Sequence, residues 1–165
     1  MASNTFVGRM IGAAMLDVPT YEAVEHDQTL TVQAGAVIAL QAGAAGLATS
    51  AAVLGGILSS LLGWFCGAGL IYLIGTRLFG GEATWGEVLR TLGFAASPGI
   101  LIIFAAFPFL GWFIGIAVGL WWLAAMAVAI RQALDVSTGK AILSGILGFL
   151  AYGIIRVALA GVFGG

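Results

Sequence analysis

The sequence predicts an all-α integral membrane protein with five transmembrane helices preceded by short amphipathic helices at the membrane interface. Of the 165 residues, 61% are hydrophobic and only 8% are charged, whereas soluble domains carry about 25% charged residues. No Asp, Glu, Lys or Arg occurs in residues 28–76 or 91–130. Because a spanning helix needs about 20 apolar residues, each stretch holds two spans, and the residues after Lys140 hold a fifth.

Residues 1–29 are expected to form a cytoplasmic and interfacial segment. Thr5–Leu16 is amphipathic, with Phe6 and Met10 on one face, and is typical of a helix that lies in the interface; a frayed N-terminus is the alternative. Asp17 is placed to cap a second short helix that ends towards Asp27. The apolar run in this segment is too short for a signal peptide.

The membrane domain is expected to cover residues 30–165, which leaves no room for a soluble domain. The third span follows a capping box formed by Thr84 and Glu87, and Pro98 should kink it. The expected spans are residues 30–49, 52–74, 89–107, 109–130 and 141–163.

Charged residues recur only after every second span, so nearly all of them should lie on one side of the membrane. The positive-inside rule makes this side cytoplasmic. The N-terminus is then cytoplasmic and the C-terminus lies on the opposite side. A net charge of −1 gives no general attraction to nucleic acid.

Small residues recur at every fourth position in several spans, a pattern that lets helix backbones approach closely. Packing within the chain is the favoured role, and a homo-oligomer interface stays open. The rows that we assign to helix packing are Gly55, Ser59, Gly63 and Gly67, and Gly111, Gly115 and Gly119.

Arg156 is the ionisable residue that interrupts a span, at a cost of about 2.5–3.5 kcal/mol if it lay at the bilayer centre. One interpretation is that it reaches out to lipid phosphates. The other is a polar path that Arg156 forms with Gln41, Tyr152 and the break at Pro98. Gln33, like Gln41, is expected to form hydrogen bonds between helices.

The acidic segment around Glu22 and His26 has the helical spacing of a metal site, but a solvated acidic face that pairs with nearby arginines is the favoured interpretation. No metal, other cofactor or catalytic activity is expected, because no Ser or Cys has a histidine within reach. The chain is therefore predicted not to be an enzyme. The expected cytoplasmic docking face comprises Asp17, Tyr21, Glu22, Glu25, Asp27, Arg77, Arg90, Arg131 and Asp135.

Four motifs resemble the bacterial branch of the Yip-domain family, the Ypt/Rab-interacting proteins. They are Leu16-Asp17-x-x-Thr20-Tyr21-x-x-Val24-Glu25-x-Asp27, Gly75-x-x-Leu78-x-Gly80-Gly81, Arg90-Thr91-Leu92-Gly93-Phe94-Ala95 followed by Pro98, and Ala129-x-Arg131-Gln132-Ala133-Leu134-Asp135. The resemblance implies a five-span domain in the bacterial inner membrane. The Asp-Leu-Tyr-Gly-Pro motif of the eukaryotic branch is not present, so a Rab partner is not carried over.

These observations predict a non-catalytic membrane scaffold or adaptor. The alternative is a small transport or lipid-handling protein that uses the polar path near Arg156, Gln41 and Pro98. Expected partners are membrane lipids and a protein in the membrane or at its cytoplasmic face.

Overall fold

The computed structural model describes residues 5–49 and 51–163 of the protein, with side chains up to residue 158. Within these ranges the fold is all-helical. The elements are α1 (Phe6–Ala14), α2 (Val18–His26), the 3-10 helix η1 (Gln28–Leu30), α3 (Thr31–Thr49), α4 (Val53–Phe79), α5 (Trp85–Ala95), the 3-10 helix η2 (Ser97–Ala106), α6 (Gly111–Leu134) and α7 (Thr138–Phe163).

Five helical stretches in the described ranges are long and apolar enough to cross a membrane, which confirms the predicted number. They are Gln28–Thr49, Val53–Phe79, Trp85–Ala106, Gly111–Leu134 and Thr138–Ala158.

The N-terminal segment forms two short helices with polar caps. The Thr5 side chain accepts a hydrogen bond from Gly8 N at 3.1 Å at the start of α1. Asp17 caps α2 by accepting a hydrogen bond from Thr20 N at 3.1 Å. Between the helices, Leu16 adopts a left-handed conformation with φ 61°, so the chain turns sharply from α1 into α2.

Two helices continue past the ends predicted for their spans. Helix α4 runs to Phe79, where Gly80 ends it in the left-handed conformation (φ 68°) and donates to the carbonyl of Gly75. Helix α6 runs to Leu134 and is ended in the same way by Asp135 (φ 51°). Backbone caps therefore determine where these helices stop, and both extend into the charged segments.

The third span changes helix type at the proline. Its start has the predicted capping box, in which Thr84 N donates to Glu87 Oε2 at 2.6 Å and Glu87 N donates to Thr84 Oγ1 at 3.4 Å. Helix α5 ends at Ala95, and Pro98, which has no N–H to donate, lies in the first turn of η2. The expected kink takes the form of a ten-residue 3-10 segment, although such segments are usually three or four residues long.

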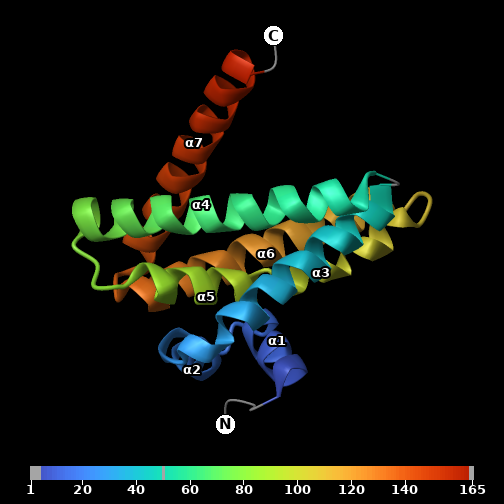
Figure 1. The fold of residues 1–165 in the computed structure, drawn as a ribbon. Coiled ribbons are helices and arrows are strands. Elements are labelled where there is room, and N and C mark those ends of the chain that lie inside the picture. Colours follow the sequence, from blue (N-terminus) through green and yellow to red (C-terminus); the bar gives the residue numbers. More distant parts are fainter. Residues whose placement is uncertain (1–4, 50, 164–165) are drawn as a thin grey trace.

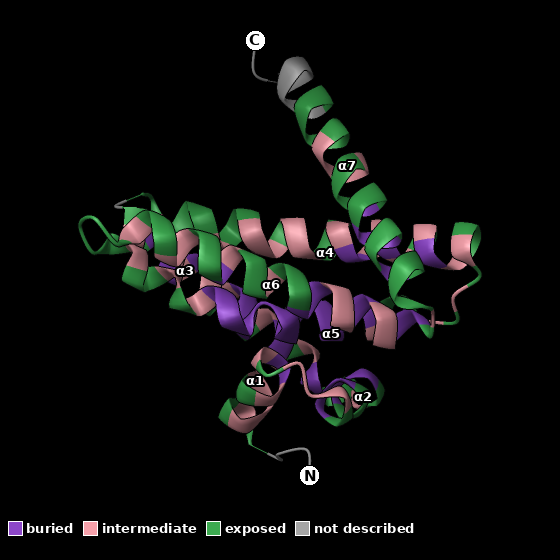
Figure 2. Ribbon diagram, turned by 180° about the vertical axis from the view of Figure 1, so that it is seen from behind, coloured by how far each residue is buried: buried purple, intermediate pink, exposed green. Residues whose placement is uncertain are grey.

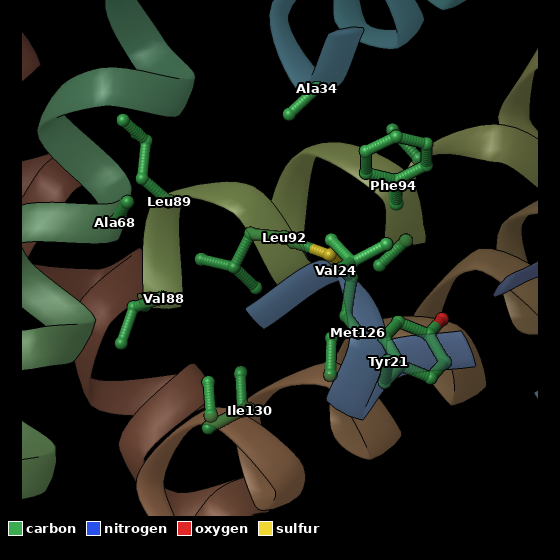
Figure 3. Packing of buried hydrophobic residues seen from close by; sticks show 14 of the residues in the cluster. Tyr21, Val24, Ala34, Ala68, Val88, Leu89, Leu92, Phe94, Met126 and Ile130 are labelled. Atoms are coloured by element: carbon green, nitrogen blue, oxygen red, sulfur yellow. The ribbon is translucent and has the colours of Figure 1, made fainter. Parts of the chain in front are cut away.

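Helices α3, α4, α6 and the α5–η2 pair form the bundle, α1 and α2 lie against one side of it, and α7 diverges from it towards the C-terminus (Figure 1). Helix α5 is the central element, because every residue from Val88 to Ala95 is buried (Figure 2). In Figure 3, Tyr21 and Val24 of α2 lie beside Leu92 of α5 and Met126 of α6. The N-terminal helices are therefore part of the hydrophobic core.

Candidate functional site

A buried arginine on α5 holds the end of α2. The Arg90 side chain is 5% exposed. Its Nε donates to the carbonyls of Val24 at 3.2 Å and Glu25 at 3.1 Å, and its Nη2 donates to the carbonyl of Glu25. Both carbonyls belong to the last turn of α2, where carbonyls lack partners within the helix and a positive charge is favourable. Arg90 thus caps α2 from a neighbouring helix.

Two aromatic side chains tie the turn between α1 and α2 to the same bundle. The hydroxyl of Tyr21, which is fully buried, donates to the carbonyl of Ala13 at 2.9 Å and reaches that of Ala125 on α6 at 3.4 Å. From α6, Trp121 Nε1 donates to the carbonyl of Ala14 at 2.6 Å. The turn is therefore held by side chains on both sides.

Contacts from α1 complete this attachment. Arg9 Nη1 donates to Gln33 Oε1 on α3 at 3.2 Å, so Gln33 forms an interhelical hydrogen bond of the kind that we expected. The rings of Phe6 and Phe94 meet edge to face, with centroids 6.4 Å apart. The opposite side of α1 is also apolar but exposed, and carries Val7, Ile11 and Met15.

The predicted docking residues fall into three groups. Tyr21, Glu25 and Arg90 are buried, so they hold α2 in place and are not exposed to a partner. The half-buried members are Asp17, Asp27 and Arg131, and the exposed members are Glu22, Arg77 and Asp135.

The expected pairing of acids with arginines needs correction. Arg90 binds backbone carbonyls of α2 and not the carboxylates, because the last turn of α2 ends against the middle of α5. Arg131 Nε donates to Gln132 Oε1 at 3.2 Å. Asp27 accepts hydrogen bonds from Thr29 Oγ1 at 2.6 Å and from Thr29 N at 3.0 Å, and these lower the pKa of its carboxyl group; the charges of Arg9 and Arg90 lower this pKa further.

Acidic side chains from three elements instead act on one carboxyl group, that of Glu25. Burial raises the pKa of Glu25 to about 7; the charge of His26 lowers this pKa, and the negative charges of Asp135, Glu87 and Glu22 raise it. The pKa of His26 is raised by the hydrogen bond between its Nδ1 and the carbonyl of Glu22, and then by the charge of Glu25. We call Glu22, Glu25, Glu87 and Asp135 the acidic cluster.

A second site lies inside the bundle, where α3, α4, α5, α6, α7 and the Ala96 junction line a cavity of about 270 Å³. Its polar lining residues are Gln41 of α3, Ser60 of α4, Trp122 of α6 and Tyr152 of α7. The walls are otherwise apolar, and are formed by Ile38, Gly63, Trp64, Gly67, Ala68, Ile71, Leu92, Ala96, Met126 and Phe149.

The polar groups of this cavity lack partners in the described part of the chain. Trp122 Nε1 is inaccessible to solvent and donates to no described acceptor. The side chains of Gln41, Ser60 and Tyr152 form no hydrogen bond with a described residue either. The buried Trp122 Nε1 without a partner costs about 1–3 kcal/mol, whereas Gln41, Ser60 and Tyr152 are half-buried.

The structure brings some of the predicted polar path together. Gln41 and Tyr152 line the cavity, and Arg156 is exposed in an adjoining groove that shares Tyr152. Pro98 does not line either, but a Cβ atom on the following Gly99 would lie 2.7 Å from Gln41 Cγ. The predicted path is therefore a cavity and a neighbouring groove, with Pro98 outside both.

Comparison with known families identifies the family of the chain. A family model described as the Yip1 domain matches residues 4–160. The chain belongs to the Yip1 domain family. No curated protein sequence matches it, and no solved structure matches it. With its five apolar helices, this Yip1-domain chain is a multi-pass membrane protein.

The glycine rows of this Yip1 domain differ in what surrounds them. A Cβ atom at Gly63 would lie 2.9 Å from the Tyr152 hydroxyl, and one at Gly111 would lie 2.1 Å from the carbonyl oxygen of Ala105. Gly115 has ordinary packing, at 3.9 Å from Ile102, and Ser59 is exposed. The row positions that face open space are Gly55, Gly67 and Gly119.

Sequence reasoning missed Trp122 and Ser60 as site residues. The signal that could have identified Trp122 was its position in the sequence. Tryptophans of membrane helices are enriched at the interfaces, and Trp122 lies near the middle of α6. Ser60 has no comparable signal, since a serine in an apolar helix is also a common packing residue.

Proposed function

We propose that this Yip1-domain chain is a non-catalytic membrane scaffold or adaptor, and that the acidic cluster docks a partner with a basic surface. The observation that carries this is that Glu22, Glu87 and Asp135, from α2, α5 and the end of α6, lie close enough to Glu25 for their negative charges to raise its pKa. Like charges held together reduce stability. A basic partner would remove that repulsion.

The attachment of α2 supports the same proposal. Arg90 and Tyr21 fix the helix by buried hydrogen bonds, while Glu22 and Asp135 remain exposed. A surface whose backbone is already ordered loses little conformational entropy when a partner binds. This rigid support suits a docking site better than a mobile terminal segment would.

We place the acidic cluster in the cytoplasm, at the charged end of the bundle. Lys140 Nζ donates to the carbonyl of Phe79 at 3.0 Å, and Glu82 N donates to the carbonyl of Leu134 at 3.0 Å. The ends of α4, α6 and α7 that carry Arg77, Arg131 and Lys140 therefore lie together. By the positive-inside rule this end faces the cytoplasm of a bacterial inner membrane, which puts the N-terminus inside and the C-terminus outside.

Helix α1 fits a position partly within the membrane. Trp121, which holds the carbonyl of Ala14, precedes Arg131 by ten residues, or about 15 Å of helix. The exposed stripe of Val7, Ile11 and Met15 would then contact lipid, and Phe6 would contact the bundle.

Charge changes at the acidic cluster test the docking function. Glu22→Lys and Asp135→Asn should each reduce recovery of a partner crosslinked in native membranes at least fivefold. Asparagine is chosen at position 135 because it tolerates the left-handed conformation. Glu82→Lys is the matched control, because Glu82 is exposed and does not act on the pKa of Glu25. Equal recovery with all three variants would contradict docking at this cluster. Recovery of only the chain itself with lipid would contradict the scaffold function.

The cavity favours a second candidate function, lipid or small-molecule handling. Its lining contains no carboxylate, imidazole or thiol, which supports binding without catalysis. Pro98 and Arg156 lie outside the lining, which favours a binding site over a continuous route for transport.

A further inference from the structure

We propose that the cavity between α3, α4, α5, α6 and α7 binds a neutral lipid with a small head that carries carbonyl and hydroxyl groups. This inference is independent of docking at the acidic cluster. It starts from the four polar side chains whose hydrogen bonds are unmet: Gln41, Ser60, Trp122 and Tyr152.

The types of polar group define the head of the ligand. Trp122 Nε1 can only donate, so it requires an acceptor such as an ester carbonyl. The Gln41 amide and the Ser60 and Tyr152 hydroxyls can both donate and accept, which suits ligand hydroxyl groups. No charged side chain lines the cavity, and an unpaired charge there would be costly. The head is therefore neutral.

The walls define the rest of the ligand. Trp64, Met126 and Phe149 provide an apolar surface beside the polar groups. Water could bind the four polar side chains, but it would not fill the apolar remainder of the lining, which offers a water molecule no partner. A volume of about 270 Å³ is close to the lower end of small-molecule sites, about 300–1,000 Å³. The head and the adjoining chain segment fit, and the remainder extends into the membrane.

The opening of the cavity faces the lipid. Phe149 is 42% exposed and Tyr152 is half-buried, although both line the cavity. Beyond them α7 diverges from the bundle (Figure 1). A lipid can therefore enter sideways from the membrane, between α7 and the bundle.

Two glycines of α4 provide a blocking variant and its control. Gly67 lines the cavity and Gly55 does not; a Cβ atom at either meets nothing within 4 Å. Gly67→Leu should fill the cavity without a clash, and Gly55→Leu adds the same side chain elsewhere on the helix. Leucine raises helix propensity relative to glycine, so neither variant should unfold the chain.

The test uses the full chain in phosphatidylcholine nanodiscs with a monoacylglycerol that carries a photoactivatable diazirine in its chain. We expect the label on the peptides that contain Met126 and Phe149, and unlabelled monoacylglycerol should reduce this labelling. Labelling should fall at least tenfold in Gly67→Leu and change less than twofold in Gly55→Leu. Trp122→Phe should weaken competition about 3- to 10-fold, the effect of one hydrogen bond.

Label spread over exposed side chains such as Leu54 and Leu120, and unchanged in Gly67→Leu, would overturn the proposal, because it would reveal surface lipid only. Absence of label would overturn it as well. Thermal unfolding of each variant checks its fold. If Gly67→Leu or Trp122→Phe is unstable, Ser60→Ala, which removes only a hydroxyl group, tests the binding site in their place. Ser60→Ala should also weaken competition, and unchanged competition in a folded Ser60→Ala chain would overturn the proposal.

Discussion

Replacing Arg90 by alanine should detach the two N-terminal helices from the bundle while the bundle stays folded. The guanidinium group donates to the carbonyls of Val24 and Glu25, and it is 5% exposed. Hydrogen bonds from a charged group contribute about 1.5–3 kcal/mol each. Removing a buried charge recovers part of this, because its desolvation cost disappears. We therefore expect the attachment of α1 and α2 to lose about 2–3 kcal/mol.

Amide hydrogen exchange of the chain in nanodiscs measures this directly. A loss of about 2–3 kcal/mol corresponds to exchange that is roughly 30- to 150-fold faster in α1 and α2, with α4 and α6 unchanged. Arg90→Lys should have an intermediate effect, because it keeps the charge but not the planar fork. Arg77→Ala is the control, since Arg77 is exposed near the end of α4. The reasoning is refuted if exchange in α1 and α2 changes less than threefold, or if α4 and α6 lose protection equally.

Two further results are expected. Burial raises the pKa of Glu25 from 4.5 to about 7, so the folded state binds this proton more tightly than the unfolded state. The attachment of α2 should therefore be most stable below about pH 4.5 and should lose stability as the pH rises to about 7. Amide hydrogen exchange, corrected for its intrinsic pH dependence, should show this loss, and Glu25→Gln should remove most of the pH dependence. Gly148→Leu should destabilise the contact of α7 with α4 by about 1–3 kcal/mol, because a Cβ atom there would lie 2.5 Å from Ile71 Cγ1. Gly153→Leu is the control, since a Cβ atom at Gly153 meets nothing within 4 Å. A decrease in the thermal unfolding temperature no larger than that of Gly153→Leu would contradict this prediction.

Local features of the fold could be predicted from the sequence because each depends on neighbouring residues. The number of spans follows from the spacing of charges, and the capping box from Thr84 and Glu87. The helix ends at Gly80 and Asp135 were missed because hydropathy reports where lipid ends, not where backbone hydrogen bonding ends. A helix with a cap can continue into water.

The role of Arg90 could not be predicted, because it depends on where α2 lies. In the sequence this arginine flanks an apolar stretch, as residues at a membrane surface do. It is buried only because α2 folds back and ends against α5. The cavity is a similar case, since its lining combines residues from Ile38 to Tyr152, and periodicity within one helix does not place them together.

The polar groups within the spans divide into those with a partner and those without. Gln33 and Trp121 have partners on α1 or the turn after it, and Trp64, which also lines the cavity, donates through Nε1 to the carbonyl of Leu89 on α5 at 2.9 Å. Gln41 and Trp122 are chemically similar to these residues but have no partner among the described residues. Because an unpaired polar group in a lipid-surrounded bundle costs stability, apolar residues would fill the cavity better if packing were its only role. The unpaired groups therefore favour a ligand in the cavity, and the groups paired with α1 and the turn after it have a structural role.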